Sequence, residues 1–184
     1  MMSKTTKIVL KRQTKFRGPR KIGIDSSCLY DLISSPELFS HQHARIFKTE
    51  GIFYTHRICF SEVRDKLMEK ENYSKDEAEK EVKNFLKNNN INIIEKDFSN
   101  KELLKELYRR CKNEKIGIHP PDSYIIVDLI KYGINKIFST NNHFRVACNV
   151  MGIDGSGFPS LDRELKDRIR DALFRPNKKP TRRR

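Results

Sequence analysis

Three carboxylates and one carboxamide are spaced along the chain in a way that would allow them to bind a metal ion together. Asp25 ends the apolar stretch KIGID, and Asp122 opens the stretch DSYIIVDLI. Glu62 lies within RICFSEVRDKL, and Asn141 follows the apolar stretch KIFST. Carboxylates that share one pocket repel one another unless a cation compensates their charge. Oxygen donors suit a hard divalent cation, so the set predicts a site for Mg²⁺ or Mn²⁺.

Each of the four residues also has a purely structural explanation. Asp25 can cap the helix that follows it, and Asp122 stands where an acid stabilises a helix dipole. Glu62 alone is typical of a solvated helix residue, and Asn141 alone is typical of a turn. An aspartate directly after a buried strand is nevertheless costly unless a cap, a basic side chain or a metal binds it. The prediction of a metal site therefore depends on the whole set and on its order along the chain.

The elements that must position these side chains alternate between strand and helix patterns. Short apolar runs predict four strands, at residues 21–25, 51–55, 91–96 and 135–139. Apolar residues at helical spacing predict helices at 28–34, 36–48, 57–71, 74–89, 99–114, 120–133 and 160–174. Ser74 and Glu77 form a capping-box pattern, and Ser26 or Ser27 is the expected cap of the first helix. We also expect an edge strand at residues 8–10 and a glycine-rich turn before the last helix.

This alternation predicts an α/β fold, a three-layer sandwich in which helices flank a mostly parallel sheet of four or five strands. In such sheets, ligands bind beyond the carboxyl ends of the strands, where the strand order switches. Asp25 ends the first predicted strand, and Asn141 follows the fourth. We therefore expect both side chains at the same edge of the sheet.

The positive charge of the chain is concentrated at its two ends. The chain has 184 residues and a formal net charge of +14. Residues 1–21 contain eight basic residues and no acid, and residues 175–184 contain six basic residues and no acid. These fourteen charges account for the whole excess, so the segment between them is neutral. The division predicts a basic arm at 1–20, an α/β domain at 21–174 and a basic tail at 175–184.

Such cationic ends are typical of proteins that bind nucleic acids, although solvated tails or contact with an anionic membrane would also explain them. Neither end shows an amphipathic face, which favours nucleic acid over a membrane surface. The basic residues expected to contact phosphates are Lys11, Arg12, Lys15, Arg17, Arg20, Lys178, Lys179, Arg182, Arg183 and Arg184.

Other features of the composition exclude several classes of protein. Hydrophobic residues make up 36% of the chain and charged residues 34%, as in folded globular proteins. No run approaches the roughly 18 apolar residues that a membrane span needs, and no secretory signal is recognisable. The four cysteines, Cys28, Cys59, Cys111 and Cys148, form no CxxC pair. Buried thiols in a reducing compartment explain them better than disulfides or a zinc site, so we expect a cytoplasmic protein without a membrane partner.

The ordered set of residues resembles the PIN domain, a family of metal-dependent ribonucleases that includes toxins. The resemblance covers about residues 20–148 and is carried by IDSSCLYDLI, by FSEV and by PPDSYIIVDLIKYGINKIFSTNNHF. The last stretch is the most specific, because it joins an acid, an apolar helix, a glycine, a strand and an ending of the form Ser/Thr-x-Asp/Asn-x-x-Phe. Ser139, Asn141 and Phe144 form that ending here.

The resemblance implies a role for each residue of the set. The implied catalytic residues are Asp25, Glu62, Asp122 and Asn141. Of these, the implied ligands of the Mg²⁺ or Mn²⁺ ion are Asp25, Asp122 and Asn141. The residues implied to orient ligands or contact substrate are Ser27 and Ser139. His143, which lies near them in the sequence, is expected to contact a phosphate or a partner rather than to act as a base. Asn141 departs from the family pattern, which usually has a fourth aspartate here, so the site has one negative charge fewer and a second tightly bound metal is less favourable.

The implied function is hydrolysis of RNA phosphodiester bonds by a metal-dependent endoribonuclease. The alternative is a PIN-like RNA-binding or ribosome-associated protein with weak or lost catalysis, which Asn141 and the basic ends together favour. DNA substrates and unrelated α/β functions also remain open. The implied partners are RNA, including ribosomal or transfer RNA, an antitoxin-like inhibitor or a ribonucleoprotein, and a second copy of the chain in a homodimer.

Two other families that place an acid after the first strand fit less well. Haloacid-type phosphatases need a second aspartate two residues later, where this chain has Ser27. Receiver domains need a lysine after a late strand, and residues 139–144 contain none.

Overall fold

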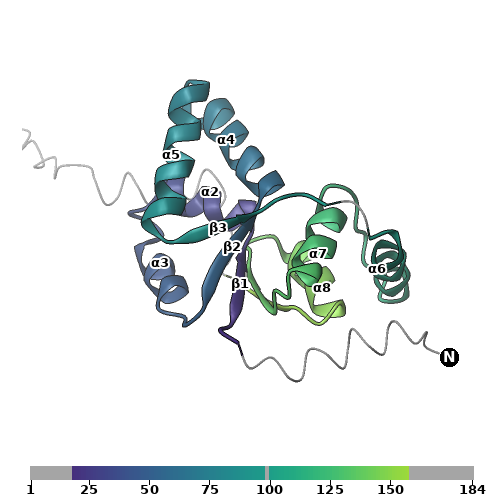
Figure 1. Cartoon of the computed structure of the whole chain (residues 1–184). Coiled ribbons are helices and arrows are strands. Elements are labelled where there is room, and N and C mark those ends of the chain that lie inside the picture. Colours follow the sequence, from purple (N-terminus) through teal and green to yellow (C-terminus); the bar gives the residue numbers. More distant parts are fainter. Residues whose placement is uncertain (1–17, 98–99, 158–184) are drawn as a thin grey trace, which may run out of the picture.

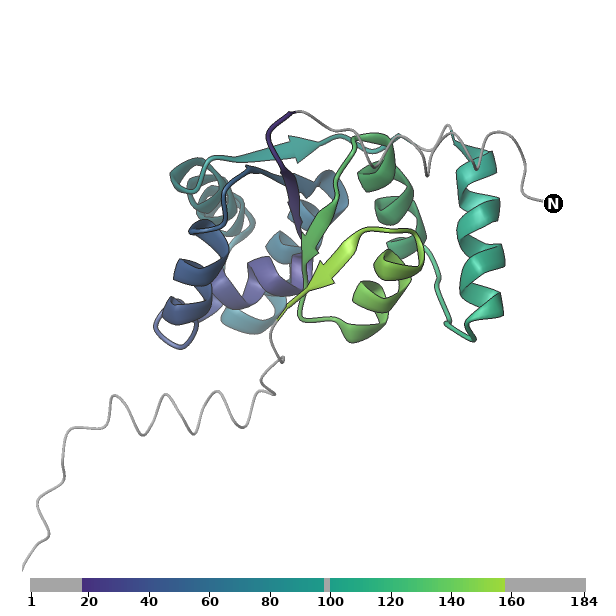
Figure 2. The ribbon, with the colours of Figure 1, turned by 90° about the horizontal axis from the view of Figure 1, so that it is seen from below.

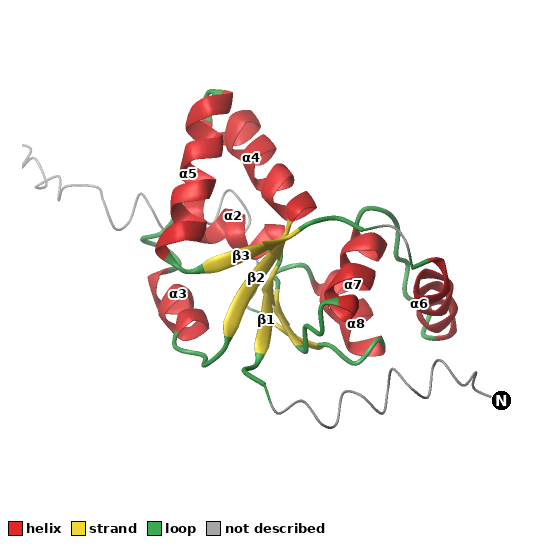
Figure 3. Ribbon diagram, viewed as in Figure 1, coloured by secondary structure: helices red, strands yellow, loops and turns green. Residues whose placement is uncertain are grey.

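Five parallel strands form the central sheet in this computed structural model, which describes residues 18–97 and 100–157 (Figure 1, Figure 3). The strands are β1 (Lys21–Ile24), β2 (Ile52–His56), β3 (Ile91–Ile94), β4 (Lys136–Phe138) and β5 (Asp154–Ser156). Their spatial order is β3-β2-β1-β4-β5, and every neighbouring pair is parallel. The predicted α/β fold with a mostly parallel sheet is therefore confirmed.

Helices cover both faces of this sheet (Figure 2). The helices of the described residues are α2 (Ser26–Ser34), α3 (Ser40–Phe47), α4 (Arg57–Glu71), α5 (Lys75–Asn88), α6 (Lys101–Asn113), α7 (Asp122–Lys131) and α8 (Asn142–Val150). One apolar cluster, which includes Leu29 and Val63, packs helices α2, α3, α4 and α5 against one face of the sheet. A second cluster, which includes Ile126 and Phe144, packs helices α6, α7 and α8 against the other face. The two clusters give the expected three-layer sandwich.

The order of the strands switches at β1. The chain places β2 and β3 on one side of β1 and then returns to place β4 and β5 on the other side. The loops after β1 and β4 therefore become neighbours, and the backbone N–H of Asp25 donates to the carbonyl oxygen of Phe138 at 2.9 Å. In open α/β sheets, such a switch point is where a ligand crevice forms.

Local sequence explains several of these elements. Ile22 and Ile24 of β1 are buried, and the glycine between them leaves room for Ile137, since a Cβ at Gly23 would lie 2.5 Å from Ile137 Cδ1 and would displace the end of that side chain. The capping box of α5 is confirmed, because the side chain of Ser74 accepts the backbone N–H of Glu77 and the side chain of Glu77 accepts that of Ser74. Chain segments with strong local signals thus adopt the predicted structure.

Of the three residues that the sequence offered as the cap of α2, the structure selects Asp25 rather than Ser26 or Ser27. Three local predictions were wrong. The helix expected to begin at residue 36 begins at Ser40, because residues 36–38 form a turn. Helix α8 and strand β5 occupy residues that we expected to form only a glycine-rich turn.

The two missed elements have different physical causes. Helix α8 carries a detectable signal, since its buried residues Phe144, Ala147 and Cys148 recur at helical spacing. Strand β5 has the sequence DGS, which has little β propensity. It forms because β4 offers a free edge, and Gly155 permits the close approach of α8: a Cβ there would lie 2.7 Å from the backbone oxygen of Arg145. Tertiary packing therefore overrides propensity at β5.

Other predictions fall on residues outside the described ranges. These are the edge strand at 8–10, the helix at 160–174 and all of the phosphate-binding residues except Arg20. Arg20 precedes β1 and is exposed. The domain limits at residues 20 and 174 stay predictions. In the part of the chain that the structure describes, every helix is too short or too polar to cross a bilayer.

Candidate metal centre

Asp25 lies at the switch point, directly after β1, and is only 5% exposed. Its Oδ2 atom accepts hydrogen bonds from the hydroxyl groups of Ser27 at 2.7 Å and of Ser139 at 2.8 Å. The backbone N–H of Ser27 also donates to Oδ2, at 3.4 Å, which caps α2. The other oxygen, Oδ1, accepts from the thiol of Cys59, a weak donor, at 3.7 Å. One oxygen of Asp25 is thus held by strong donors, while Oδ1 retains accepting capacity.

Ser27 and Ser139 fix the Asp25 carboxylate from two different loops. Each hydroxyl group has one proton, which it donates to Asp25, and each hydroxyl oxygen then accepts a backbone N–H. Ser27 Oγ accepts from Thr140 at 3.1 Å, and Ser139 Oγ accepts from Asn141 at 3.0 Å. The two hydroxyl oxygens lie 3.1 Å apart. This network joins the loop after β4 to the start of α2 and orients Asp25.

Asn141 caps a helix that the sequence did not lead us to expect. Its side-chain oxygen accepts the backbone N–H of Phe144 at 3.3 Å, at the start of α8. The residue is exposed, and its amide oxygen keeps a second lone pair. Aspartate caps helices as well as asparagine does, so the cap alone does not explain the choice of asparagine. Metal binding by Asn141 stays a prediction.

Asp122 begins α7 and is partly buried. Burial, followed by the negative charges of Asp25 and Glu62, raises the pKa of the Asp122 carboxyl group to about 6. The positive charge of Lys66 acts in the opposite direction. Carboxylates shift one another's pKa in this way when they lie close together and away from bulk water. The fold thus brings the three predicted carboxylates within electrostatic reach of one another.

Glu62 lies in the second turn of α4, and Lys66 follows one turn later on the same helix. Both side chains are partly buried. Residues four apart share a helix face, so Lys66 faces the same side of α4 as Glu62. This lysine was not among the predicted site residues, although its spacing from Glu62 was a usable signal. Cys59 and Thr140 were not predicted either, because their contacts with the site depend on tertiary structure.

The oxygen donors of the site suit a hard cation that keeps some of its water ligands better than a cation held only by protein side chains. Across residues 18–97 and 100–157, no three acidic, histidine or cysteine side chains are grouped closely enough to hold an ion among themselves. Mg²⁺ usually keeps several water ligands and uses only one or two carboxylates. The free lone pairs at Asp25 Oδ1 and the electrostatically coupled Asp122 suit such an ion. The residues present therefore fit Mg²⁺ or Mn²⁺ with a partly aqueous shell.

The nearby thiols offer no alternative chemistry. Burial and the charge of Asp25 raise the pKa values of Cys28, Cys59 and Cys148 well above the ordinary thiol value. These thiols stay protonated at neutral pH, so they are not activated as nucleophiles. His143 is exposed at the start of α8, and its predicted contact with substrate is untested.

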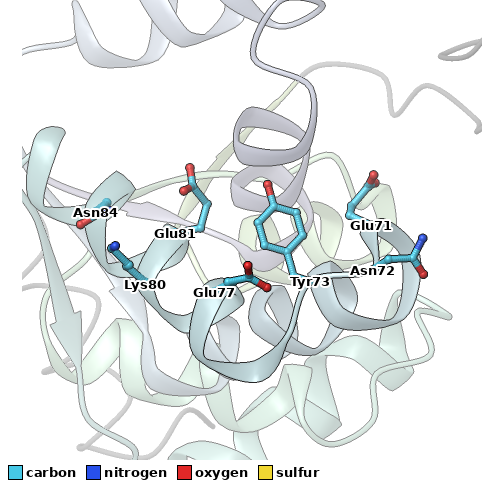
Figure 4. Close-up of a pocket in the computed structure, with 7 residues that line it drawn as sticks. All are labelled: Glu71, Asn72, Tyr73, Glu77, Lys80, Glu81 and Asn84. Atoms are coloured by element: carbon cyan, nitrogen blue, oxygen red, sulfur yellow. The ribbon is translucent and has the colours of Figure 1, made fainter.

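A concavity lies between the end of α4 and α5 (Figure 4). Its lining residues are Glu71, Asn72, Tyr73, Glu77, Lys80, Glu81 and Asn84. Two of its acids already have structural partners: Glu71 accepts from the Tyr30 hydroxyl at 2.7 Å, and Glu77 belongs to the capping box of α5. None of the predicted site residues lines it, so this concavity is separate from the candidate metal centre.

Comparisons with known proteins identify the family and support the fold. The PIN-domain family model matches residues 22–150, a span that contains all of the predicted metal ligands. No curated protein matches the chain significantly.

Two solved structures are similar to this one. One is the crystal structure of VapBC2 from Rickettsia felis bound to a DNA fragment from their promoter, with a TM-score of 0.58 and 12% identity over 74% of this chain and 98% of that chain. The other is PAE2754 from Pyrobaculum aerophilum, with a TM-score of 0.47 and 12% identity over 82% of this chain and 96% of that chain. The first likeness supports the fold, and the family match covers most of the chain. The chain therefore belongs to the PIN-domain family, a family of nucleases.

Proposed function

We propose that this protein is a metal-dependent endoribonuclease that hydrolyses RNA phosphodiester bonds at the acidic site on the switch-point edge of the sheet. The observation that carries the proposal is the raised pKa of Asp122, which burial first and then the negative charges of Asp25 and Glu62 bring to about 6. Such a concentration of negative charge favours a divalent cation, and PIN domains generally depend on one.

The residues of the site take distinct roles in this proposal. Asp25 and Asp122 hold Mg²⁺ or Mn²⁺ directly or through water, and Asn141 and Glu62 complete the shell. When bound, the metal lowers the pKa of a water molecule and offsets charge on the scissile phosphate. Ser27 and Ser139 keep Asp25 Oδ2 occupied, so that Oδ1 faces the ligand. The roles rest on the hydrogen bonds of Asp25 and on the family pattern.

Substrate binding is assigned to the basic ends and to His143. Lysine and arginine residues of the segments 1–20 and 175–184 contact RNA phosphates, an interaction that weakens steeply with salt and carries little sequence information. His143 is exposed at the start of α8, which suits a phosphate contact. Specificity would come from RNA shape or from unstacked bases, as in other RNA-binding proteins.

The second candidate function is RNA binding or ribosome association with weak or lost catalysis. Asn141 favours it, because an amide attracts a divalent cation less strongly than the aspartate usual at this position. The basic ends also favour it, since they supply phosphate contacts that need no catalysis. The two functions differ in one measurable property, which is metal-dependent cleavage.

Further proposals concern partners and location. An antitoxin-like inhibitor is supported by the fold likeness to VapBC2 of R. felis. Homodimer formation and association with ribosomal or transfer RNA are supported by family resemblance and charge alone. The four cysteines are free and buried, which is typical of proteins in a reducing cytoplasm.

A cleavage assay tests the main proposal. Structured and single-stranded RNA is incubated with the full chain at low salt in the presence of Mn²⁺, Mg²⁺ or EDTA. We expect cleavage with either metal and none with EDTA, and we expect Asp25→Asn and Asp122→Asn to abolish it. Tight RNA binding without metal-dependent cleavage would instead support the second function. Absence of both binding and cleavage would contradict both.

A further inference from the structure

A buried histidine–aspartate pair lies beside the acidic site and has no role in the proposed chemistry. His56 is the last residue of β2, Asp128 lies in α7, and each is 1% exposed. His56 Nε2 and Asp128 Oδ2 are 3.0 Å apart. Burying two ionisable groups in an apolar core costs free energy, and a good hydrogen bond only partly offsets that cost. The pair therefore calls for a specific structural or functional reason.

The hydrogen bonds of His56 define its protonation state. The backbone N–H of Ile58 donates to His56 Nδ1 at 3.2 Å, which caps α4. Because Nδ1 accepts, the proton of the neutral ring is on Nε2, which donates to Asp128. Burial lowers the pKa of His56 and so favours this neutral form. Both ring nitrogens are engaged, which excludes His56 as a general base.

Asp128 joins three parts of the chain. Its Oδ2 atom accepts from His56 and also from the backbone N–H of Asp97, which follows β3, at 2.9 Å. Its Oδ1 atom is buried and has no hydrogen-bond partner among the described residues. Among residues 18–97 and 100–157, the hydrogen bonds to this carboxylate therefore come from the ends of β2 and β3.

The pair adds a hydrogen bond between two helices that lie mainly in different layers, where Ile58 and Cys59 at the start of α4 already contact the apolar cluster that contains α7. Helix α4 packs mainly against α2 and α5, whereas α7 packs mainly against α6 (Figure 1). Glu62 is on α4 and Asp122 is on α7, so the two acids approach the site from opposite faces of the sheet. The His56–Asp128 hydrogen bond links the start of α4 directly to α7 across the edge of the sheet.

We propose that His56 is a positioning residue of the acidic site, and that its hydrogen bond to Asp128 sets the spacing between α4 and α7 and hence between Glu62 and Asp122. The effect on metal binding rests on the proposed function, whereas the effect on helix spacing does not.

Two substitutions separate the two hydrogen bonds of His56. In His56→Asn, the amide oxygen takes the place of Nδ1, so the α4 cap is kept but the side chain is too short to reach Asp128. In His56→Gln, the amide N–H reaches the place of Nε2, so the link to Asp128 is kept but the cap is lost. Val82→Ala serves as a destabilised control, because Val82 is fully buried in α5 and belongs to the other apolar cluster.

Helix spacing is measured without metal in the full chain. Spin labels attached at Glu69→Cys in α4 and at Tyr132→Cys at the end of α7 report the distance between the two helices by pulsed electron paramagnetic resonance. The four native cysteines are buried, so they do not react with the label. We expect His56→Asn to shift or broaden the distance distribution, while His56→Gln and Val82→Ala keep that of the parent. An unchanged distribution in His56→Asn overturns the inference.

Mn²⁺ affinity is then measured by calorimetry on the same variants without labels. We expect His56→Asn to bind Mn²⁺ about tenfold more weakly, as for other residues that orient ligands indirectly, and His56→Gln to bind nearly as the parent does. If His56→Asn and Val82→Ala lose Mn²⁺ affinity equally, general destabilisation explains the loss, and the positioning role is overturned. If the parent chain binds no Mn²⁺, the proposed function fails, and the spin-label distances alone decide the inference.

Discussion

The hydroxyl group of Ser139 donates a hydrogen bond to Oδ2 of Asp25 at 2.8 Å, although the two residues are 114 positions apart in the chain. Ser139 also accepts the backbone N–H of Asn141 at 3.0 Å. One buried hydroxyl therefore joins the end of β4 to the first acid of the site. This contact makes the loop after β4 part of the candidate metal centre.

Replacement of Ser139 by alanine should weaken both folding and metal binding. The change removes a donor to Asp25 and leaves the N–H of Asn141 without its acceptor, which should cost about 1–3 kcal/mol of unfolding free energy. Mn²⁺ affinity should fall about tenfold or more, because Asp25 loses a group that orients it. Ser156→Ala is the control, since Ser156 is on β5 and its hydroxyl contacts only Asp154 in the described structure. Equal metal affinity in the two variants would contradict the assigned role.

Metal affinity should depend on pH through Asp122. The pKa of Asp122 is about 6 in the folded protein, so Mn²⁺ must displace a proton below that pH, and affinity should fall by about tenfold per pH unit there. Calorimetric titrations at pH 5, 6 and 7.5 check this. Asp122→Asn should bind weakly at every pH, without the step near pH 6. A flat profile in the parent chain would rule out Asp122 as a ligand.

The same carboxyl group should also make the metal-free protein more stable at mildly acidic pH. An unfolded aspartate has a pKa of about 3.9, so the folded chain takes up a proton at a higher pH than the unfolded chain does. The stabilisation is therefore fully present below about pH 4 and lost as pH rises through the folded pKa of about 6. Denaturation of the parent and of Asp122→Asn, compared at pH 4.5 and pH 7, isolates this contribution from those of other groups.

Asp25→Asn should abolish cleavage while leaving the fold intact. Asparagine caps helices well and can still accept the hydroxyl protons of Ser27 and Ser139, so the network around position 25 survives. The loss of a negative ligand should lower the cleavage rate by at least about 100-fold, more than the loss of an indirect contact does. Single-turnover RNA cleavage gives the rate, and thermal unfolding gives the stability. Retained cleavage would place the catalytic metal elsewhere.

Asn141→Asp separates the two proposed functions. Aspartate keeps the cap on α8 and adds a negative charge to the site. Mn²⁺ affinity should rise several-fold, and cleavage should rise with it if catalysis in the parent is limited by metal binding. Asn142→Asp, one residue further on, is a matched control for a general effect of charge. An equal gain in Mn²⁺ affinity in both variants would mean that residue 141 is not a metal ligand.

Removal of the basic ends should weaken RNA binding and flatten its dependence on salt. Deletion of residues 1–20 and 176–184 takes away twelve basic residues and no acid. Each lost phosphate contact should reduce the slope of log affinity against log salt by about 0.7 for single-stranded RNA. RNA affinity is measured at several salt concentrations for each single deletion and for the double deletion, and these measurements give the slopes. Unchanged slopes would mean that RNA contacts only the folded body.

Much of the fold could be predicted from the chain alone because its signals are local. The apolar runs of β1 to β4, the capping box at Ser74 and Glu77, and the apolar spacing of α6 and α7 all act within a few residues. Strand β5 could not be predicted, since three residues of low β propensity become a strand only where β4 presents an edge and Gly155 lets α8 approach.

The sequence by itself determined which acids and hydroxyl groups follow which strands, and hence the family and the edge of the sheet that carries the site. Only the tertiary structure decided how those groups act on one another. The hydrogen bonds to Asp25, the raised pKa of Asp122 and the link between His56 and Asp128 all join residues far apart in the chain. The strength of these hydrogen bonds and electrostatic interactions depends on the distance between the groups and on the exclusion of water. Both are properties of the packed protein rather than of any one segment of the chain.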